Sequence, residues 1–152
     1  MRTALLSDVD ALAELINDAF QVEKVFFDRD RVNAEKVREF MRTGQFLLAE
    51  DSGGLAGCVY VEVRGDRGYV GLLSVEPLRQ GTGLGRKLMD AAEDYFRAAG
   101  CRGLDLRVIS PRTPLPPFYS RLGYVETGTA PFSAELQCKV PGHYIIMSKE
   151  FV

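Results

Sequence analysis

Residues 79–96, RQGTGLGRKLMDAAEDYF, place three glycines at alternate positions directly before a segment of helical periodicity. Apolar side chains recur from Leu84 to Ala99 at the spacing of one helix face, and Gly100 supplies a stop. The first N–H groups of a helix lack partners within the helix, and glycine lets an anion approach them closely. The stretch therefore predicts a helix whose N-terminus binds a phosphorylated ligand, with a simple tight turn as the alternative.

Two nucleotide-binding loops can be compared with this stretch position by position. A dinucleotide fingerprint, G-x-G-x-x-G, that started at Gly81 would need a glycine where Arg86 stands. A P-loop needs the same glycine, and although Lys87 fits its lysine, Leu88 replaces the Ser or Thr that would hold magnesium. Both nucleotide-binding interpretations therefore fail on specific residues.

The segments around the glycine loop predict one α/β domain over residues 1–152 with a mixed sheet. Two helices are expected first, one with Ser7 as N-cap and one over residues 34–42 with Asn33 as N-cap. Strand patterns joined by glycine turns then follow at residues 45–51, 55–64 and 69–75. The strand at residues 103–109 is reached through a helix, which predicts that it runs parallel to residues 69–75. A short helix at residues 118–122 and strands from residues 124 and 143 complete the pattern.

The composition is that of a globular domain, with 46% hydrophobic and 26% charged residues. Asp8 and Asp10 precede the first apolar run, unlike a signal peptide, so a cytoplasmic location is expected, without a membrane partner. The net charge is −2 and the basic residues are dispersed, which argues against a nucleic-acid partner. The three cysteines form no C-x-x-C pair, so no metal site is expected.

Gln80-Gly81-Thr82-Gly83-Leu84-Gly85, preceded by LLSVEP, resembles motif A (Q/R-x-x-G-x-G/A) of the GNAT superfamily of acyl-CoA N-acyltransferases. The predicted order of helices and strands over most of the chain is similar to the family's order as well. The resemblance implies an α/β (α+β) fold with a mixed, mostly antiparallel sheet of about seven strands. It also implies about four flanking helices and a sheet splayed between the fourth and fifth strands.

The same resemblance implies acetyl-CoA as co-substrate and a site for it. The coenzyme A pyrophosphate would lie on the loop formed by Gln80, Gly81, Thr82, Gly83, Leu84, Gly85 and Arg86. The pantetheine arm would pair with the end of the preceding strand, at Leu73, Ser74 and Val75. Dimers are common in the family, so a homodimer is kept as an expectation.

The stretch PPFYSRLGY, residues 116–124, resembles the family's Y-x-x-x-G-F/Y segment and puts Tyr119 at the position of the general acid. A tyrosine with its usual pKa of about 10 stays protonated at neutral pH, above a thiol at about 8.5. The alternative is a tyrosine packed on the core with its hydroxyl in solvent. One departure stands nearby, because Arg112 occupies a position where many relatives carry an Asn that contacts the pantetheine.

The general base is not fixed, because residues 69–75 contain none of the carboxylates that many relatives carry there. Glu62 and His143 are the candidates, along with a water chain to backbone carbonyls. His143 has a usual pKa of about 6.5, which suits deprotonation of an ammonium. Both residues also fit an ordinary surface position.

The resemblance implies that residues 21–30 and 129–143 shape the acceptor site. Phe26 and Phe27 would form an apolar wall there, and Glu23 or Asp28 would attract a cationic amine. Alternatively, the phenylalanines only complete the core. The predicted function is direct transfer of the acetyl group of acetyl-CoA to a primary amine of a small molecule. The alternatives are a peptide or protein amine as acceptor and an acyl-CoA-binding domain without turnover.

Overall fold

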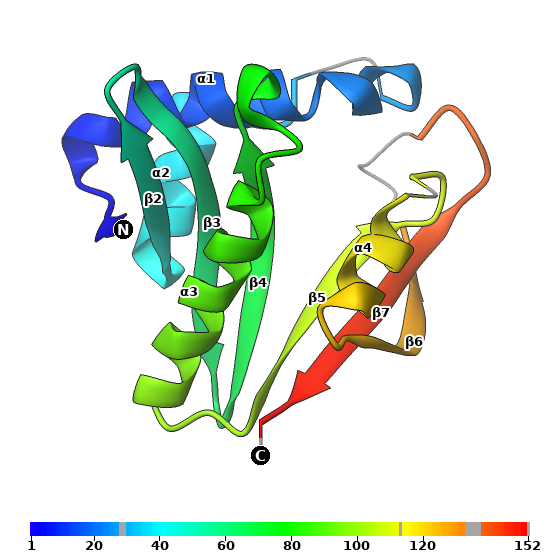
Figure 1. The fold of residues 1–152 in the computed structure, drawn as a ribbon. Helices are drawn as coiled ribbons and strands as arrows, with labels where there is room; N and C mark the ends of the chain where they lie inside the picture. The colour runs from blue at the N-terminus through cyan, green and yellow to red at the C-terminus, as the bar shows by residue number, and fades with distance from the viewer. Residues whose placement is uncertain (28–29, 113, 133–137, 152) are drawn as a thin grey trace.

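Seven strands form a single sheet in the order β1-β2-β3-β4-β5-β7-β6 in the computed structural model, which describes residues 1–27, 30–112, 114–132 and 138–151 (Figure 1). The strands are β1 (Arg2–Thr3), β2 (Gln45–Asp51), β3 (Gly54–Arg64), β4 (Arg67–Val75), β5 (Gly103–Ile109), β6 (Val125–Pro131) and β7 (His143–Glu150). The helices are α1 (Val9–Ala19), α2 (Ala34–Thr43), α3 (Leu84–Ala98) and α4 (Leu115–Arg121), with short 3-10 turns η1 (Leu6–Asp8), η2 (Gln21–Val25) and η3 (Pro77–Arg79). No helix among these described ranges is long and apolar enough to cross a membrane.

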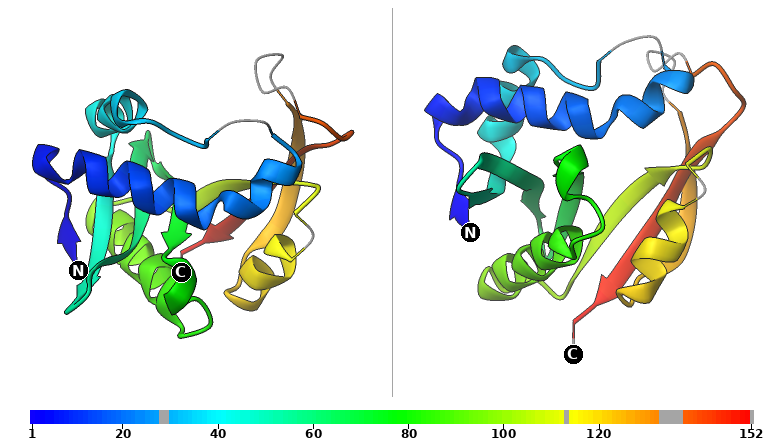
Figure 2. Two further views of the ribbon diagram at one scale, coloured as in Figure 1. Left: turned by 90° about the horizontal axis from the view of Figure 1, so that it is seen from above. Right: turned by 45° about the horizontal axis from the view of Figure 1, so that its top comes forward.

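Helices cover both faces of the sheet, with α1 and α2 on one face and α3 and α4 on the other (Figure 2). Alternate residues of β3 show the division: Val59 and Val61 pack in the core under α3, whereas Cys58 and Tyr60 pack in the core under α1 and α2. All strand neighbours are antiparallel except β4 and β5, which are parallel. The predicted mixed sheet with its four helices is confirmed.

The two predicted N-caps have different outcomes. The Asn33 side chain accepts the N–H of Lys36 at 2.8 Å, so this cap of α2 is confirmed. The prediction for Ser7 is wrong, because α1 begins at Val9 with Asp8 as N-cap. Ser7 lies inside the turn η1, which precedes the helix: the Asp8 carboxylate accepts the N–H of Leu5, the N-cap of η1, at 2.7 Å and pairs with Arg2 at 2.8 Å.

The sheet splays between β4 and β5, as the resemblance implied. The two strands pair over only four residue pairs, from Arg67 with Gly103 to Val70 with Leu106, and then diverge into the V seen in Figure 1. A β-bulge lies just beyond this point, because the register of β3 and β4 shifts between Cys58 and Tyr60. Leu72, inside the bulge, adopts a positive φ of 52°, which is uncommon for any residue except glycine. The bulge bends β4 away from β5 and leaves the upper edge of β4 without a strand partner.

Arg67 ties the three strands at the closed end of the V. Its guanidinium donates to both carboxylate oxygens of Asp105 on β5, at 2.8 and 2.9 Å, and it pairs with Glu150 on β7 at 2.8 Å. Ser148 on β7 also donates to Asp105, at 2.7 Å. The Arg67 guanidinium holds the pKa of the Asp105 carboxyl below its usual range. Because β4 and β5 share few backbone hydrogen bonds, this cluster of side chains helps to hold the two strands together.

Replacement of Arg67 by methionine should therefore lower the free energy of unfolding by about 1–2 kcal/mol at neutral pH, since the bidentate pair is partly exposed. The pKa of Asp105 is lowered in the folded state, so its contribution is present at neutral pH and is lost as the pH falls below about 4. Urea unfolding of wild type and R67M should show a difference that shrinks in acid.

Arg102→Met is the matched control, because Arg102 and its partner Asp66 are largely exposed, and its cost should stay below about 0.5 kcal/mol. Equal stability of R67M and R102M would contradict a role of Arg67 in holding the closed end together.

Candidate active site

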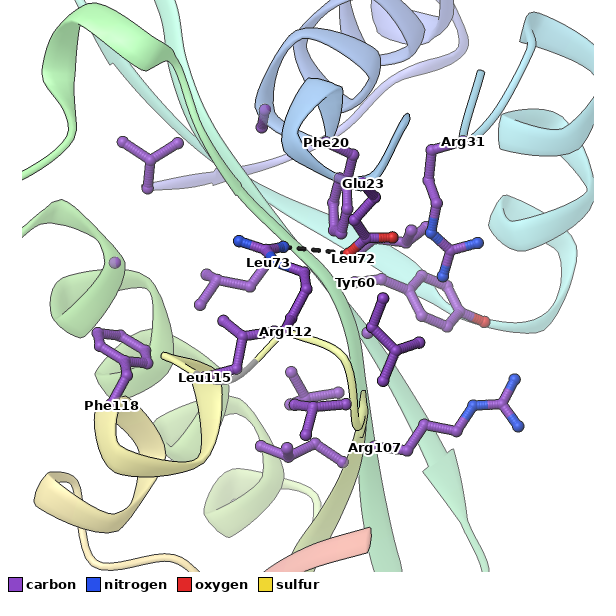
Figure 3. A pocket seen from close by; sticks show the side chains of 18 of the residues that line it. Phe20, Glu23, Arg31, Tyr60, Leu72, Leu73, Arg107, Arg112, Leu115 and Phe118 are labelled. Carbon is purple, nitrogen blue, oxygen red and sulfur yellow. Dashed lines mark hydrogen bonds and ion pairs between the residues drawn. The ribbon is translucent and has the colours of Figure 1, made fainter. Parts of the chain in front are cut away.

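A cavity of about 1310 Å³ lies at the open end of the V. Its walls come from the glycine loop and α3, from β4 and β5, from α4, and from the segment between α1 and α2 (Figure 3). The splay of two neighbouring strands thus creates a passage between the two faces of the sheet. One side of the passage is next to the glycine loop, and the other is next to the turn η2.

The glycine loop presents backbone N–H groups to this cavity. Gly81 and Gly83 have φ of 80° and 83°, a conformation that side chains other than glycine rarely adopt. Gly83 is the N-cap of α3 and offers no capping side chain, and the first hydrogen bond of the helix is from Lys87 to Gly83. Among the described residues, the N–H groups from Leu84 to Arg86 have no partner, and no acidic residue lies in the first turn. The end of α3 is therefore suited to bind an anion.

Ion pairs and hydrogen bonds hold the loop in this conformation. Arg79 pairs with Asp51 at the end of β2 and, at 3.1 Å, with Glu76. The Thr82 hydroxyl donates to the Arg79 carbonyl at 2.6 Å, and the Gln80 side chain donates to the Val75 carbonyl at 3.3 Å. The anion-binding groups are thus fixed in position before any ligand arrives.

Most residues predicted for the coenzyme line the cavity. The lining includes Leu73, Val75, Gln80, Gly81, Gly83, Leu84, Gly85 and Arg86. Ser74 and Thr82 are not part of it. Ser74 is 1% exposed and its hydroxyl donates to the Leu72 carbonyl at 2.9 Å, because alternate side chains of a strand point to opposite faces.

Tyr119 on α4 also lines the cavity, from the same side as the glycine loop. It is 6% exposed, and its ring lies between those of Phe118 and Tyr124, at centroid distances of 5.0 and 5.9 Å. Burial raises the pKa of its hydroxyl, so the group stays protonated at neutral pH. The geometry matches what a proton donor needs, and the catalytic role itself stays a prediction.

Neither candidate base is among the residues that line the cavity. Glu62 accepts the hydroxyl of Tyr60 at 2.6 Å, and Tyr60 does line it. Although burial acts in the opposite direction, hydrogen bonds from Arg64 and Tyr60 hold the pKa of Glu62 below its usual range. The backbone N–H of His143, at the exposed start of β7, donates to Ser110 at 3.0 Å. A base role for either residue would need a relay through another group.

Only some of the residues predicted for the acceptor site line the cavity. Glu23 and Phe27 line the cavity, Phe26 does not, and Asp28 lies outside the described residues, as do residues 133–137. Glu23 is 7% exposed and pairs with Arg112 at 3.1 Å, drawn as the dashed line in Figure 3. This pair joins η2 to the segment after β5 across the open end of the V. The negative charge of Glu23 is thus already balanced by Arg112.

Sequence reasoning assigned no site role to six of the described arginines that line the cavity, Arg31, Arg64, Arg79, Arg107, Arg112 and Arg121. A signal for Arg107 was available, because in GLDLRVI the apolar residues alternate with Asp105 and Arg107, which must share the other face of the strand. Arg112 was noticed only as a departure from an asparagine. Nothing in the sequence pointed to Arg31. Within the described ranges, no three His, Cys, Asp or Glu side chains gather where they could hold a metal ion.

Comparison with known sequences identifies the family. The acetyltransferase (GNAT) family matches residues 9–124, and the chain belongs to it. The chain is 31% identical over 86 residues to an IAA acetyltransferase of Azospirillum brasilense, which covers 55% of this chain and 56% of that protein. It is 37% identical over 79 residues to a mycothiol acetyltransferase of Clavibacter michiganensis, which covers 51% of this chain and 26% of that protein. The chain thus spans about half of one relative and a quarter of the other.

Solved structures share the fold at low sequence identity. The ribosomal-protein-S18-alanine N-acetyltransferase of Escherichia coli superposes with a TM-score of 0.76 at 18% identity, over 98% of this chain and 91% of that one. A Salmonella typhimurium protein solved with its cofactor acetyl-CoA gives a TM-score of 0.75 at 20% identity, again over 98% and 91%. At these identities the likeness concerns the fold alone.

The glycine loop yields a prediction for binding. A Cβ added at Gly85 would make only ordinary contacts, 3.4 Å from Phe118 and 3.9 Å from Val75, and the family motif takes glycine or alanine at this position, so Gly85→Ala should bind coenzyme A as the wild type does. Gly83 instead has a φ of 83°, which alanine rarely adopts. Gly83→Ala should therefore shift the loop N–H groups and lower the affinity for coenzyme A, measured by calorimetric titration, about tenfold, or about 1.4 kcal/mol.

Gly128→Ala on the edge strand β6 is the matched control, since a Cβ there meets only Ile146 at 3.8 Å, and its affinity for coenzyme A should be unchanged. Wild-type affinity in G83A would show that the coenzyme does not approach this loop.

Proposed function

We propose that this chain transfers the acetyl group of acetyl-CoA directly to a primary amine of a small molecule. One observation carries the proposal: a single cavity is lined by the unpaired loop N–H groups, by the free edge of β4, and by Tyr119. These three elements suit the three parts of acetyl-CoA: the N–H groups suit a phosphate group, the strand edge suits an extended chain, and the tyrosine hydroxyl suits a leaving thiolate. Membership of the GNAT family supports the same conclusion.

The residues present suit coenzyme A along its whole length. The N–H groups from Leu84 to Arg86 and the dipole of the 15-residue helix α3 favour the pyrophosphate. The edge of β4 beyond Val70 lacks a strand partner, so its backbone groups are free to pair with the extended pantetheine arm. Leu115 and Phe118 of α4 add apolar surface on the same side.

The transfer needs an amine in its neutral form and a proton for the leaving sulfur. The thioester of acetyl-CoA supplies the acetyl group, and a C–N bond forms as the C–S bond breaks. The Tyr119 hydroxyl donates its proton to the sulfur, and the amine releases one proton, so the products are an N-acetylated amine and free coenzyme A. The candidates for receiving the amine proton remain Glu62, through Tyr60, and His143, through water.

Direct transfer is favoured over a route through an acetylated cysteine. Cys58, Cys101 and Cys138 are free thiols, and none of them is among the residues that line the cavity. Burial raises the pKa of the Cys58 thiol to about 12, so it carries almost no thiolate at neutral pH.

Tyr119→Phe tests the proposed acid. It removes one oxygen from a ring held by its neighbours, so affinity for acetyl-CoA should be unchanged while kcat falls by about 10²-fold or more. The measurement is thiol release from acetyl-CoA over a panel of aminoglycosides, polyamines, amino acids and peptides, with wild type and variant compared on the best acceptor.

Tyr95→Phe is the matched control, because Tyr95 is a partly buried tyrosine of α3 that is not among the lining residues, and it should behave as wild type. Full turnover by Y119F across the pH range would show that Tyr119 is not the acid. Tight acetyl-CoA binding with no thiol release from any amine would favour the alternative of a binding domain.

A further inference from the structure

Several described arginines line the side of the cavity that faces α1 and α2, and Arg31, Arg64 and Arg107 each stack on an aromatic ring without pairing with a carboxylate that lines the cavity. Arg31 lies over Phe20 with 5.5 Å between the guanidinium carbon and the ring centroid. Arg107 lies over Tyr144 at 4.1 Å, and Arg64 lies over Tyr69 at 3.9 Å. Stacking fixes the plane of a guanidinium and leaves its N–H edge free to donate.

The carboxylates on this side do not balance all of the positive charge. Among the described residues that line the cavity, the acidic ones are Glu23 and Asp30, and both are paired, Glu23 with Arg112 at 3.1 Å and Asp30 with Lys24 at 3.0 Å. Glu62 in turn pairs with Arg64.

Arg31 and Arg107 therefore keep their charge unmatched. Among the residues that the structure describes, neither has a carboxylate partner, and both are exposed to solvent. The acceptor side thus carries an excess of two positive charges, which come from separate elements.

These arginines are separate from the groups that suit the coenzyme. Leu106 and Val108 of β5 pack in the core under α3 and α4, so Arg107 between them points to the opposite face of the sheet. Figure 3 shows Arg31 and Arg107 on one side of β4, with Leu115 and Phe118 of α4 on its other side. The excess charge therefore lies where an acceptor would enter and not where the pyrophosphate would bind.

Resting on the proposed function, we infer that the acceptor is a small amine that also carries a carboxylate, which Arg107 binds while Arg31 adds positive charge from the facing wall. A guanidinium matches the two oxygens of a carboxylate with paired hydrogen bonds. The positive charge of this wall also disfavours polyamines and aminoglycosides, because their extra ammonium groups would meet guanidinium groups.

The same charges act on the amine of such an acceptor. The carboxylate of the acceptor balances one guanidinium, and the remaining positive charge disfavours a further one nearby, so the pKa of an ammonium at this wall is lowered and more of the amine is neutral. Only the neutral amine attacks the thioester. The cationic wall therefore contributes to activation at a site where no unpaired carboxylate lines the cavity among the described residues.

Matched acceptors test the inference. Thiol release from acetyl-CoA is measured with a series of amino acids and, in parallel, with the primary amide of each, which keeps the amine and removes the charge of the carboxylate. We expect kcat/KM for the best acid to exceed that for its amide by about tenfold or more, with most of the difference in KM. Arg107→Met should reduce this ratio towards one, and Arg107→Lys should restore part of it.

Arg38→Met is the matched control, because Arg38 is an exposed residue of α2 that is not among the lining residues, and it should keep the wild-type ratio. If R107M does not fold, the ratio of kcat/KM for acid and amide in the wild-type enzyme still tests the inference. Equal or better turnover of the amides, or of polyamines, would overturn the inference and leave the proposed function intact. No thiol release with any acid, amide or polyamine would overturn both.

Discussion

Backbone pairing between β4 and β5 ends at Val70 and Leu106, and the rest of the site depends on this early end. A sheet that continued to pair would bury the edge of β4 and close the passage between its two faces. The β-bulge at Leu72 directs β4 away, and the positive φ of that residue is a local cost that the packing around it sustains. The free strand edge, the glycine loop beyond it and the cavity all lie above this point.

Two ion-pair clusters hold the V at its ends. Arg67 joins β4 to β5 and β7 at the closed end, and Glu23 with Arg112 joins the two arms at the open end. A buried carboxylate is costly to leave unpaired, so loss of Arg112 would destabilise the position of Glu23 at the open end. In the proposed reaction donor and acceptor meet between the arms, so a fixed opening angle would favour transfer by reducing the reorganisation needed on binding.

The order of elements was predictable because each carries a local signal. The Asn33 cap, the strand of residues 55–64 between its glycine turns and the glycines before α3 all fix structure within a few residues, and all were confirmed. The start of α1 was not, because Ser7 lies inside the turn η1, where the Asp8 carboxylate accepts the N–H of Leu5.

The part of the cavity formed by the glycine loop was predictable for a similar reason, and the opposite wall was not. The glycine loop is one continuous motif. The acceptor wall instead combines Arg31, Tyr60, Arg107 and Arg112 from four separate segments. Their proximity follows from strand order and from the splay, which are tertiary features. Glu23 illustrates the limit: its position beside the cavity was anticipated, but its neutralisation by Arg112 was not.

Amide hydrogen exchange with and without acetyl-CoA tests the central claim most directly, because the claim concerns particular backbone N–H groups. We expect the coenzyme to slow exchange at residues 81–86 and at Leu73 and Val75, with little change on β6, which lies at the far edge of the sheet. Protection confined to other parts of the chain, or no protection at saturating acetyl-CoA, would contradict the account.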